Sequence, residues 1–115
     1  MRGEDVNAHT QELIDILIGA KGFIERGWTQ GELARDKQGN AVRPEDPNAV
    51  CWCVEGAIKA AGCNEKWRQI KEVLKEHGSF PAYRWNDDSD RTKEEVLEML
   101  DKCATYLRNQ TEGAH

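Results

Sequence analysis

The chain has 115 residues and a net charge of −5, because its 16 basic residues are outnumbered by 21 acidic ones. This length is enough for a single domain to bury a core without metal or disulfide cross-links. The acidic balance makes nucleic-acid binding an unfavoured function, since that function needs a basic face, and no apolar run is long enough to cross a membrane.

The N-terminal residues lack the basic and then apolar run of a signal peptide, which predicts a cytoplasmic protein. In that compartment the four cysteines are expected to be reduced thiols. Cys51 and Cys53 are too close in sequence for the common spacing of a structural zinc site. We therefore expect neither a metal nor a cofactor, and the oligomeric state stays open.

The first predicted element is a helix that begins near Thr10 and ends before Gly27. Its apolar stripe consists of Leu13, Ile16, Leu17, Ala20 and Ile24. Residues 1–9 are polar and are expected to be frayed. We expect one globular domain over residues 10–108 and a polar tail over residues 109–115.

The helical period is lost over residues 28–43, where a short β-hairpin is expected. Asp36 and Gly39 suit the first and fourth positions of a type I turn. A two-stranded hairpin is marginal in water on its own. The hairpin is therefore expected to lie on the helices.

A pattern of asparagine, apolar helix and glycine then occurs twice, from Asn48 to Gly62 and from Asn64 to Gly78. Asparagine caps the start of a helix and glycine ends one, so a second and a third helix are predicted. Gly56 lies inside the second helix, where glycine costs about 1 kcal/mol relative to alanine. Its presence indicates that another backbone or an aromatic ring approaches closely.

Residues 79–91 are predicted to form a long loop, and loops of this length are often functional. Thr92 and Glu95 form a capping box at the start of a fourth helix over residues 92–108. The predicted fold class is α+β and mostly helical, with four helices and one small β-hairpin between helices one and two.

Three of the four tryptophans lie in segments rich in glycine, cysteine or polar residues: 27–31, 51–57 and 85–92. A buried tryptophan needs a partner for its N–H group, so this clustering indicates one shared pocket. The candidate ligand- or partner-binding residues are Trp28, Gln30, Arg35, Trp52, Cys53, Trp85, Asn86, Asp87 and Arg91. No catalytic set is complete among them.

The same segments resemble a family of small bacterial and phage proteins known as a domain of unknown function. The resemblance rests on Gly27-Trp28-x-Gln30-Gly31, Trp52-Cys53-x-x-Gly56-Ala57, Trp85-Asn86-Asp87 and Arg91-Thr92-x-x-Glu95-Val96-Leu97. It covers most of residues 10–107. It implies a shared fold and a shared site, and it implies no particular activity.

Three functions are compatible with these residues. The favoured one is a non-enzymatic binding or regulatory module that acts on a protein partner through the hairpin and the 79–91 loop. The second is a small anionic-ligand or nucleotide-binding domain that uses Arg35 and Arg91, because arginine binds carboxylate and phosphate groups with two hydrogen bonds. The structural alternative for these arginines is an internal Arg–Asp bridge, and both interpretations place the hairpin beside the loop.

The third function is a thiol-dependent enzyme that uses Cys53. A helix N-terminus lowers the pKa of a thiol and can make it a nucleophile. The alternative is that Cys53 packs on the apolar face of the second helix with Val54 and Ala57. A similar alternative applies to Asn86 and Asp87, whose side chains are of the kind that hydrogen-bond to neighbouring backbone groups.

Overall fold

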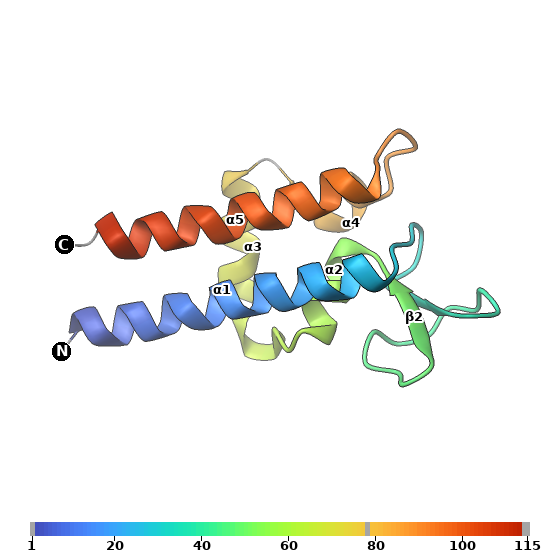
Figure 1. The fold of residues 1–115 in the computed structure, drawn as a ribbon, viewed down its shortest axis with the longest axis horizontal. Helices are drawn as coiled ribbons and strands as arrows, with labels where there is room; N and C mark the ends of the chain where they lie inside the picture. Colours follow the sequence, from blue (N-terminus) through green and yellow to red (C-terminus); the bar gives the residue numbers. More distant parts are fainter. Residues whose placement is uncertain (1, 78, 114–115) are drawn as a thin grey trace.

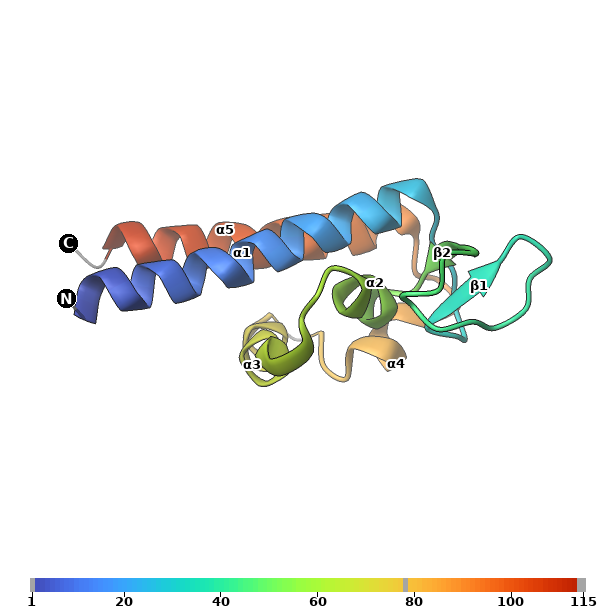
Figure 2. The same cartoon turned by 90° about the horizontal axis from the view of Figure 1, so that it is seen from below.

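The computed structural model describes residues 2–77 and 79–113, with the backbone alone at residues 2–8, 64 and 111–113. Its two longest elements are helices α1 (Arg2–Arg26) and α5 (Lys93–Gly113), which pack against each other. They run in opposite directions and form one layer of the molecule (Figure 1). Helices α2, α3 and α4 all lie on one side of this layer (Figure 2).

The intervening chain supplies the shorter elements. They are strands β1 (Ala34–Asp36) and β2 (Ala49–Trp52), helix α2 (Val54–Ala60), a 3-10 turn η1 (Asn64–Lys66), and helices α3 (Trp67–Glu76) and α4 (Ala82–Asn86). The two strands pair antiparallel, with Ala34 opposite Trp52. They lie at the end of the helical layer away from the chain termini (Figure 1). The fold is α+β and mostly helical, as predicted.

The hydrophobic core is formed where the apolar stripes of α1, α2 and α5 meet. Leu17, Ile24, Ile58 and Leu100 are completely buried there. Repetition of apolar residues at helical spacing places them on one face of each helix, which explains why these stripes could be predicted. Within residues 2–77 and 79–113, no helix combines the length and the apolar character that crossing a bilayer requires.

The prediction of four helices is wrong, because the described residues contain five α-helices. The additional one is α4, which lies inside the segment predicted to be a loop. Pro81 precedes it in an extended conformation, and the helix ends at Asn86. Five residues are too few to show a helical period, so the pattern of apolar residues does not reveal α4.

The second helix begins later than predicted. Residues 49–52 form β2 rather than the first turns of a helix, and Cys53 is the N-cap of α2 in place of Asn48. The pairing of β2 with β1 depends on residues about fifteen positions earlier, and such tertiary pairing overrides local helical spacing. Gly62 follows the helix with a positive φ of 93°, as its role as a helix stop requires.

The other predicted boundaries have mixed outcomes. Helix α1 begins at Arg2, so Thr10 lies within it rather than at its start, and α5 extends to Gly113. The side chain of Asn64 and the whole of Gly78 lie outside the described residues. The limits of the domain itself stay a prediction.

Two local predictions are confirmed, the turn over residues 36–39 and the capping box of Thr92 and Glu95. The amide of Gly39 donates to the carbonyl oxygen of Asp36 at 2.9 Å, which closes the predicted turn. The amide of Glu95 donates to Oγ1 of Thr92 at 3.2 Å, and the amide of Thr92 donates to Oε1 of Glu95 at 2.9 Å. The prediction that the hairpin lies within residues 28–43 is nevertheless wrong for its second strand, because β1 pairs with β2 at Ala49–Trp52 and makes only an isolated bridge, Arg35 with Ala41, inside that range.

Candidate functional site

Asn86 is the buried centre of a polar network that joins three segments of the chain and reaches the surface at Asp87. Its side chain is completely buried at the end of α4. Its Oδ1 atom accepts hydrogen bonds from Nε1 of Trp28 at 2.8 Å and from the amide of Val54 at 2.9 Å. Its Nδ2 atom donates to the carbonyl oxygen of Thr29 and to Oδ1 of Asp87. The amide therefore has two donated and two accepted bonds, which is its full capacity.

Residues next to Asn86 make further bonds between α4 and residues 28–43, which we call the hairpin segment. Nε2 of Gln30 donates to the carbonyl oxygens of Asn86 and Asp88 at 2.9 and 2.8 Å. The amide of Gly31 donates to Oδ1 of Asp87 at 2.9 Å. These bonds confirm the prediction that the two segments lie side by side. We call Trp28, Gln30, Asn86 and Asp87 the Asn86 network.

The two candidate arginines are engaged in contacts within the protein. Arg35 donates from Nε to Oγ1 of Thr29 and from its two terminal nitrogens to the carbonyl oxygens of Gln30 and Gly39. Arg91 donates from Nε to the carbonyl oxygen of Trp85 and stacks on that ring at 4.0 Å. The hairpin segment and α4 are thus joined by Gln30 and Asp87, and not by the Arg–Asp bridge that was considered.

Trp52 and Trp85 have different surroundings. Trp52 is 2% exposed, and its Nε1 atom donates to the carbonyl oxygen of Pro44 at 3.0 Å. Its ring also packs against Phe23, with the ring centres 4.8 Å apart. Trp85 packs partly against the core beneath Arg91. The three tryptophans are therefore packed side chains rather than the walls of one open pocket, and the indole N–H groups of Trp28 and Trp52 have partners within the protein.

Cys53 ends β2 and caps α2. Its Sγ atom accepts a hydrogen bond from the amide of Gly56 at 3.3 Å. Burial raises the pKa of the Cys53 thiol to about 11, although hydrogen bonds from the backbone of Gly56 and Glu55 oppose this increase. The expected lowering of the pKa by the helix N-terminus is therefore outweighed by desolvation. The neutral thiol is the form present at neutral pH.

Gly56 is contacted by the backbone of a distant segment, as its position within a helix had indicated. A Cβ atom on Gly56 would lie 1.9 Å from the carbonyl oxygen of Leu33. The same oxygen accepts a hydrogen bond from the amide of Cys53 at 3.1 Å. The chain at Leu33 is therefore held directly against the start of α2, while its side chain is half-buried at the surface.

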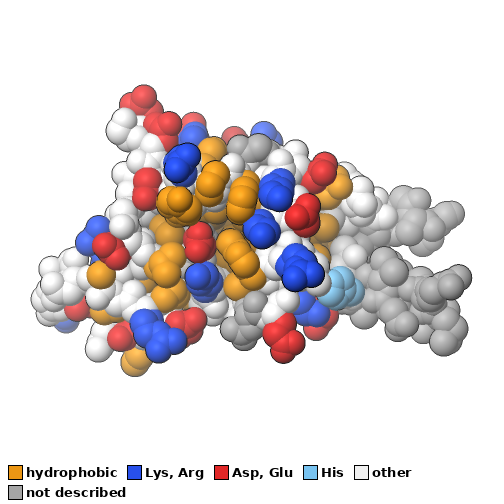
Figure 3. All heavy atoms as spheres, turned by 180° about the vertical axis from the view of Figure 1, so that it is seen from behind, with side chains coloured by type: hydrophobic (Ala, Val, Ile, Leu, Met, Phe, Trp, Pro, Cys, Tyr) orange, Lys and Arg blue, Asp and Glu red, His pale blue; other side chains and the backbone are white. Residues whose placement is uncertain are grey.

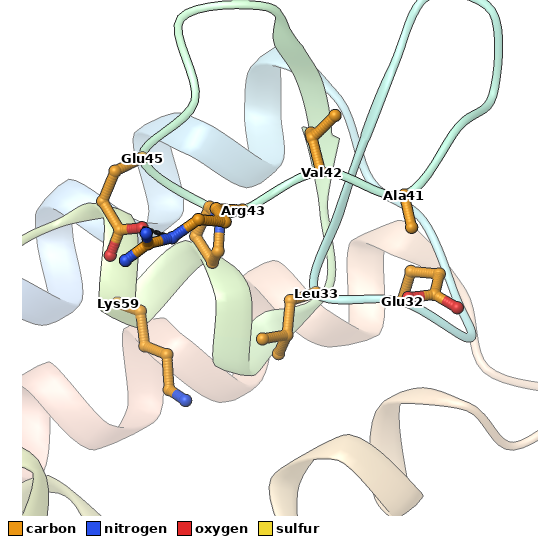
Figure 4. A pocket seen from close by; sticks show the side chains of 8 residues that line it. Glu32, Leu33, Ala41, Val42, Arg43, Glu45 and Lys59 are labelled. Atoms are coloured by element: carbon orange, nitrogen blue, oxygen red, sulfur yellow. Dashed lines mark ion pairs between the residues drawn. The ribbon is translucent and has the colours of Figure 1, made fainter.

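A cavity of about 490 Å³ opens beside Leu33. The apolar residues that line it are Leu33, Ala41, Val42 and Pro44, and the charged ones are Glu32, Arg43, Glu45 and Lys59. Residues 32–33 and 41–45 supply most of these side chains, together with Lys59 of α2 (Figure 4). Arg43 lies 4.0 Å from Glu45, and its side chain is 90% exposed.

A second cavity of about 240 Å³ also has Leu33 in its lining. It is lined by Gly31, Glu32, Leu33, Cys53, Glu55, Tyr83 and Asp87. Glu32 and Leu33 line both cavities, so the two are neighbours on the surface. Hydrophobic side chains gather on the side of the molecule that α2, α3 and α4 form, with charged side chains among them (Figure 3). We call the surface of the two cavities the Leu33 face.

The sequence predicted the residues of the Asn86 network better than the residues of the Leu33 face. Of the candidate residues, Trp28, Gln30, Asn86 and Asp87 meet in one network, whereas Arg91 and Trp85 form a separate stack. Leu33 and Tyr83 were missed as individual residues, although both lie in the segments expected to form the recognition surface. The one available signal was Gly56, since its lack of a side chain accommodates the chain at Leu33.

The fold and this region define a class: a small, mostly helical domain in which a buried asparagine joins the segment after α1 to the start of α2 and the end of α4. The chain belongs to the family of unknown function DUF6197, whose model matches residues 8–106. This match confirms the resemblance to a domain of unknown function.

Other comparisons add one similar protein. The biopolymer transport protein ExbD of Aquifex aeolicus (strain VF5) is 26% identical over 94 residues, which are 82% of this chain and 71% of that protein. No solved structure matches the chain.

Proposed function

We propose that this protein is a non-enzymatic binding module that docks a segment of a partner protein on the Leu33 face. The observation that carries the proposal is the composition of the larger cavity. Of its lining residues, the apolar Leu33, Val42 and Pro44 are half-buried or buried and the charged Lys59 is half-buried, whereas Arg43, Glu45 and Glu32 are exposed. Protein interfaces have this arrangement, with an apolar centre that receives an anchoring side chain and a polar rim.

The same arrangement favours a protein partner over a small anionic ligand. Sites for small molecules place a few polar groups inside the cavity, where they orient the ligand. Here Arg43 is paired with Glu45, and Lys59 lies 3.4 Å from Glu55. Arg35, a residue proposed for anion binding, directs three nitrogens at oxygens of the protein itself.

The Leu33 face is also held in a defined shape. The carbonyl oxygen of Leu33 is bonded to the amide of Cys53, and the amide of Gly31 is bonded to Asp87. A surface that is ordered before binding loses less conformational entropy when a partner docks. The Asn86 network thus supports the proposed function by positioning the face, and its member Asp87 also lines the smaller cavity.

The chemistry of Cys53 supports a structural role rather than thiol catalysis. The thiolate is the nucleophilic form of cysteine, and a pKa of about 11 leaves very little thiolate at neutral pH. Its Sγ atom is also occupied by the amide of Gly56. We therefore assign Cys53 to the architecture of α2.

The proposal is tested by selecting peptides from a random linear peptide library displayed on phage. The selected peptides are then measured by titration against the wild-type protein, Leu33→Ala, Tyr83→Ala and Ile18→Ala. Ile18 is the matched control, because it is an isomer of leucine, is 43% exposed and lies on α1. We expect Leu33→Ala and Tyr83→Ala to weaken binding at least about tenfold, as loss of a central interface side chain does.

Urea unfolding of each variant establishes that the domain remains folded during the titrations. Peptides that bind all of the variants as tightly as the wild-type protein would contradict docking on the Leu33 face. A library that yields no binding peptide would count against the proposal as well.

A further inference from the structure

The smaller cavity of the Leu33 face is distinctly acidic. Three carboxylate residues, Glu32, Glu55 and Asp87, line it together with Leu33 and Tyr83. No lysine or arginine is among its lining residues in the described part of the chain. Tyr83 is 49% exposed, so a large part of its side chain is accessible to a docked molecule.

Two of these carboxylates are fixed in position by the protein. Oδ1 of Asp87 accepts hydrogen bonds from the amide of Gly31 and from Nδ2 of Asn86, at 2.9 and 3.0 Å. Glu55 is 19% exposed in its side chain and lies 3.4 Å from Lys59. Carboxylates held in place by other groups interact with an incoming charge without the cost of being ordered first.

The charge of the whole Leu33 face is also negative. The two cavities contain the carboxylates of Glu32, Glu45, Glu55 and Asp87, and the cations of Arg43 and Lys59. Each cation is already within ion-pair distance of a carboxylate, Arg43 of Glu45 and Lys59 of Glu55. The surplus negative charge comes from Glu32 and Asp87, and both of these residues line the smaller cavity.

The shape of the smaller cavity fits a single long side chain. Its volume of about 240 Å³ lies below the roughly 300–1,000 Å³ typical of pockets that enclose a drug-sized ligand. Lysine and arginine place their apolar stems along apolar surface and their charged heads among polar groups. Leu33 offers such a surface for the stem, and the face of the Tyr83 ring attracts a cation.

We propose that the partner segment carries a lysine or arginine whose charged head enters this cavity between Glu32, Glu55 and Asp87. A neighbouring apolar side chain of the same segment occupies the larger cavity between Leu33 and Pro44. This inference rests on the proposed docking function and specifies the chemistry of the partner, a basic segment with an adjacent apolar residue. Complementary charge across an interface contributes specificity and speeds association.

The test uses the peptides selected on the wild-type protein. A lysine or arginine at a constant distance from an apolar residue is expected in them. In the tightest-binding peptide, replacement of that residue by norleucine or citrulline removes its charge while keeping its length. We expect about a tenfold loss of affinity, and a marked decrease in affinity between about 50 and about 300 mM sodium chloride, because salt screens the attraction.

The protein side of the test is the double variant Glu32→Gln with Glu55→Gln. It should weaken the binding of the basic peptide about tenfold and bind the norleucine or citrulline peptide no more weakly than the wild-type protein does. The matched control is Glu94→Gln, an exposed glutamate on α5 away from both cavities. Urea unfolding checks that each variant is folded.

The outcomes separate this inference from the proposed function. Peptides that lack a basic residue, or that bind the double variant as tightly as the wild-type protein, would refute a basic partner. If Leu33→Ala still abolished the binding of those peptides, docking on the Leu33 face would stand. If Leu33→Ala had no effect either, both proposals would fail.

Discussion

The Asn86 network and the Leu33 face lie next to each other and share Asp87, but their other residues differ in kind. The network consists of tryptophan, asparagine and aspartate side chains whose polar atoms are paired within the protein. The face consists mainly of apolar, tyrosine and charged side chains that line open cavities. The residues that are most conspicuous in the sequence therefore organise the fold, whereas more ordinary residues form the surface available to a partner.

This contrast follows from the cost of burying polar groups. An unpaired polar atom in the interior loses its hydrogen bonds to water, so each buried donor and acceptor needs a partner in the protein. The complete pairing of Asn86 meets this need and connects Trp28, Thr29 and Val54. Residues of the Leu33 face have no such constraint, because water hydrates them when no partner is bound.

The largest expected effect on stability is that of Asn86→Ala. The substitution leaves Nε1 of Trp28 and the amide of Val54 without their acceptor inside the protein. Each buried group left unpaired costs about 1–3 kcal/mol, so we expect the free energy of unfolding to fall by about 4 kcal/mol. Urea unfolding measures this change.

The matched control for Asn86 is the exposed Asn48, whose replacement by alanine should change stability by less than about 0.5 kcal/mol. Equal effects of the two substitutions would contradict the central role of Asn86.

Gly56→Ala is expected to have the next largest effect, about 3 kcal/mol of destabilisation. The added Cβ atom would lie 1.9 Å from the carbonyl oxygen of Leu33, so the backbone at the Leu33 face must move. This variant should affect both the fold and the Leu33 face, so we expect it to reduce peptide binding as well as stability.

The control is Gly22→Ala in α1, where nothing lies within 4 Å of the added atom. That substitution should raise stability by up to about 1 kcal/mol, because alanine favours the helix. Destabilisation by Gly22→Ala to the same extent as by Gly56→Ala would show that loss of glycine, and not contact with Leu33, is the cause.

Buried thiols should make stability fall at high pH. The pKa of Cys53 is raised by burial from 9.0 to about 11, so above about pH 9 the unfolded chain loses this proton more readily than the folded one. The contribution of the neutral thiol is fully present below pH 9.0 and is lost as the pH rises through about 11. We expect a loss of roughly 3 kcal/mol from this group over the whole range, since one pKa unit corresponds to about 1.4 kcal/mol.

Urea unfolding in reducing buffer, between about pH 8 and about pH 10.5, compares the wild-type protein with Cys53→Ala and Cys51→Ala. The slope of stability against pH should become shallower only in Cys53→Ala. The remaining slope in that variant includes Cys103, whose pKa burial raises to about 12. An unchanged slope in Cys53→Ala would mean that the Cys53 thiol is more accessible to water than its burial indicates.

Tyr83→Ala should have the smallest effect on stability, less than about 0.5 kcal/mol, because about half of the side chain is exposed. The same substitution is expected to weaken peptide binding, so it separates the function of the face from the stability of the fold. The comparison with Ile18→Ala, measured by urea unfolding and by titration, provides the control. A large loss of stability in Tyr83→Ala would place this residue with the network instead of the face.

Features that depend on neighbouring residues could be predicted from the sequence. Thr92 and Glu95 are three positions apart, so the capping box follows from their identity alone. The turn at Asp36 and the helix stop at Gly62 are local in the same sense. The apolar stripes of α1 and α5 also appear directly in the spacing of their residues.

Features that depend on distant contacts could not be predicted. Val50 and Val54 fit a helical stripe, yet Val50 lies in β2, because β1 supplies the hydrogen-bonding partner of that segment. Gly56 indicated that another group lies against α2, but nothing near it in sequence identifies Leu33. The side chains of Asn86 and Arg91 are both polar, and only the packing of α4 determines that Asn86 is completely buried.

The pairing of α1 with α5 has a consequence for biosynthesis. Nζ of Lys21 lies 3.2 Å from Oδ1 of Asp101, and Nζ of Lys93 donates to the carbonyl oxygen of Glu25. A ribosome completes α1 long before it has made α5, so the apolar stripe of the first helix emerges without its partner. The nascent chain should therefore leave the α5-facing side of this stripe exposed until α5 has emerged, a period in which chaperones can bind it and termination before α5 would leave an aggregation-prone fragment.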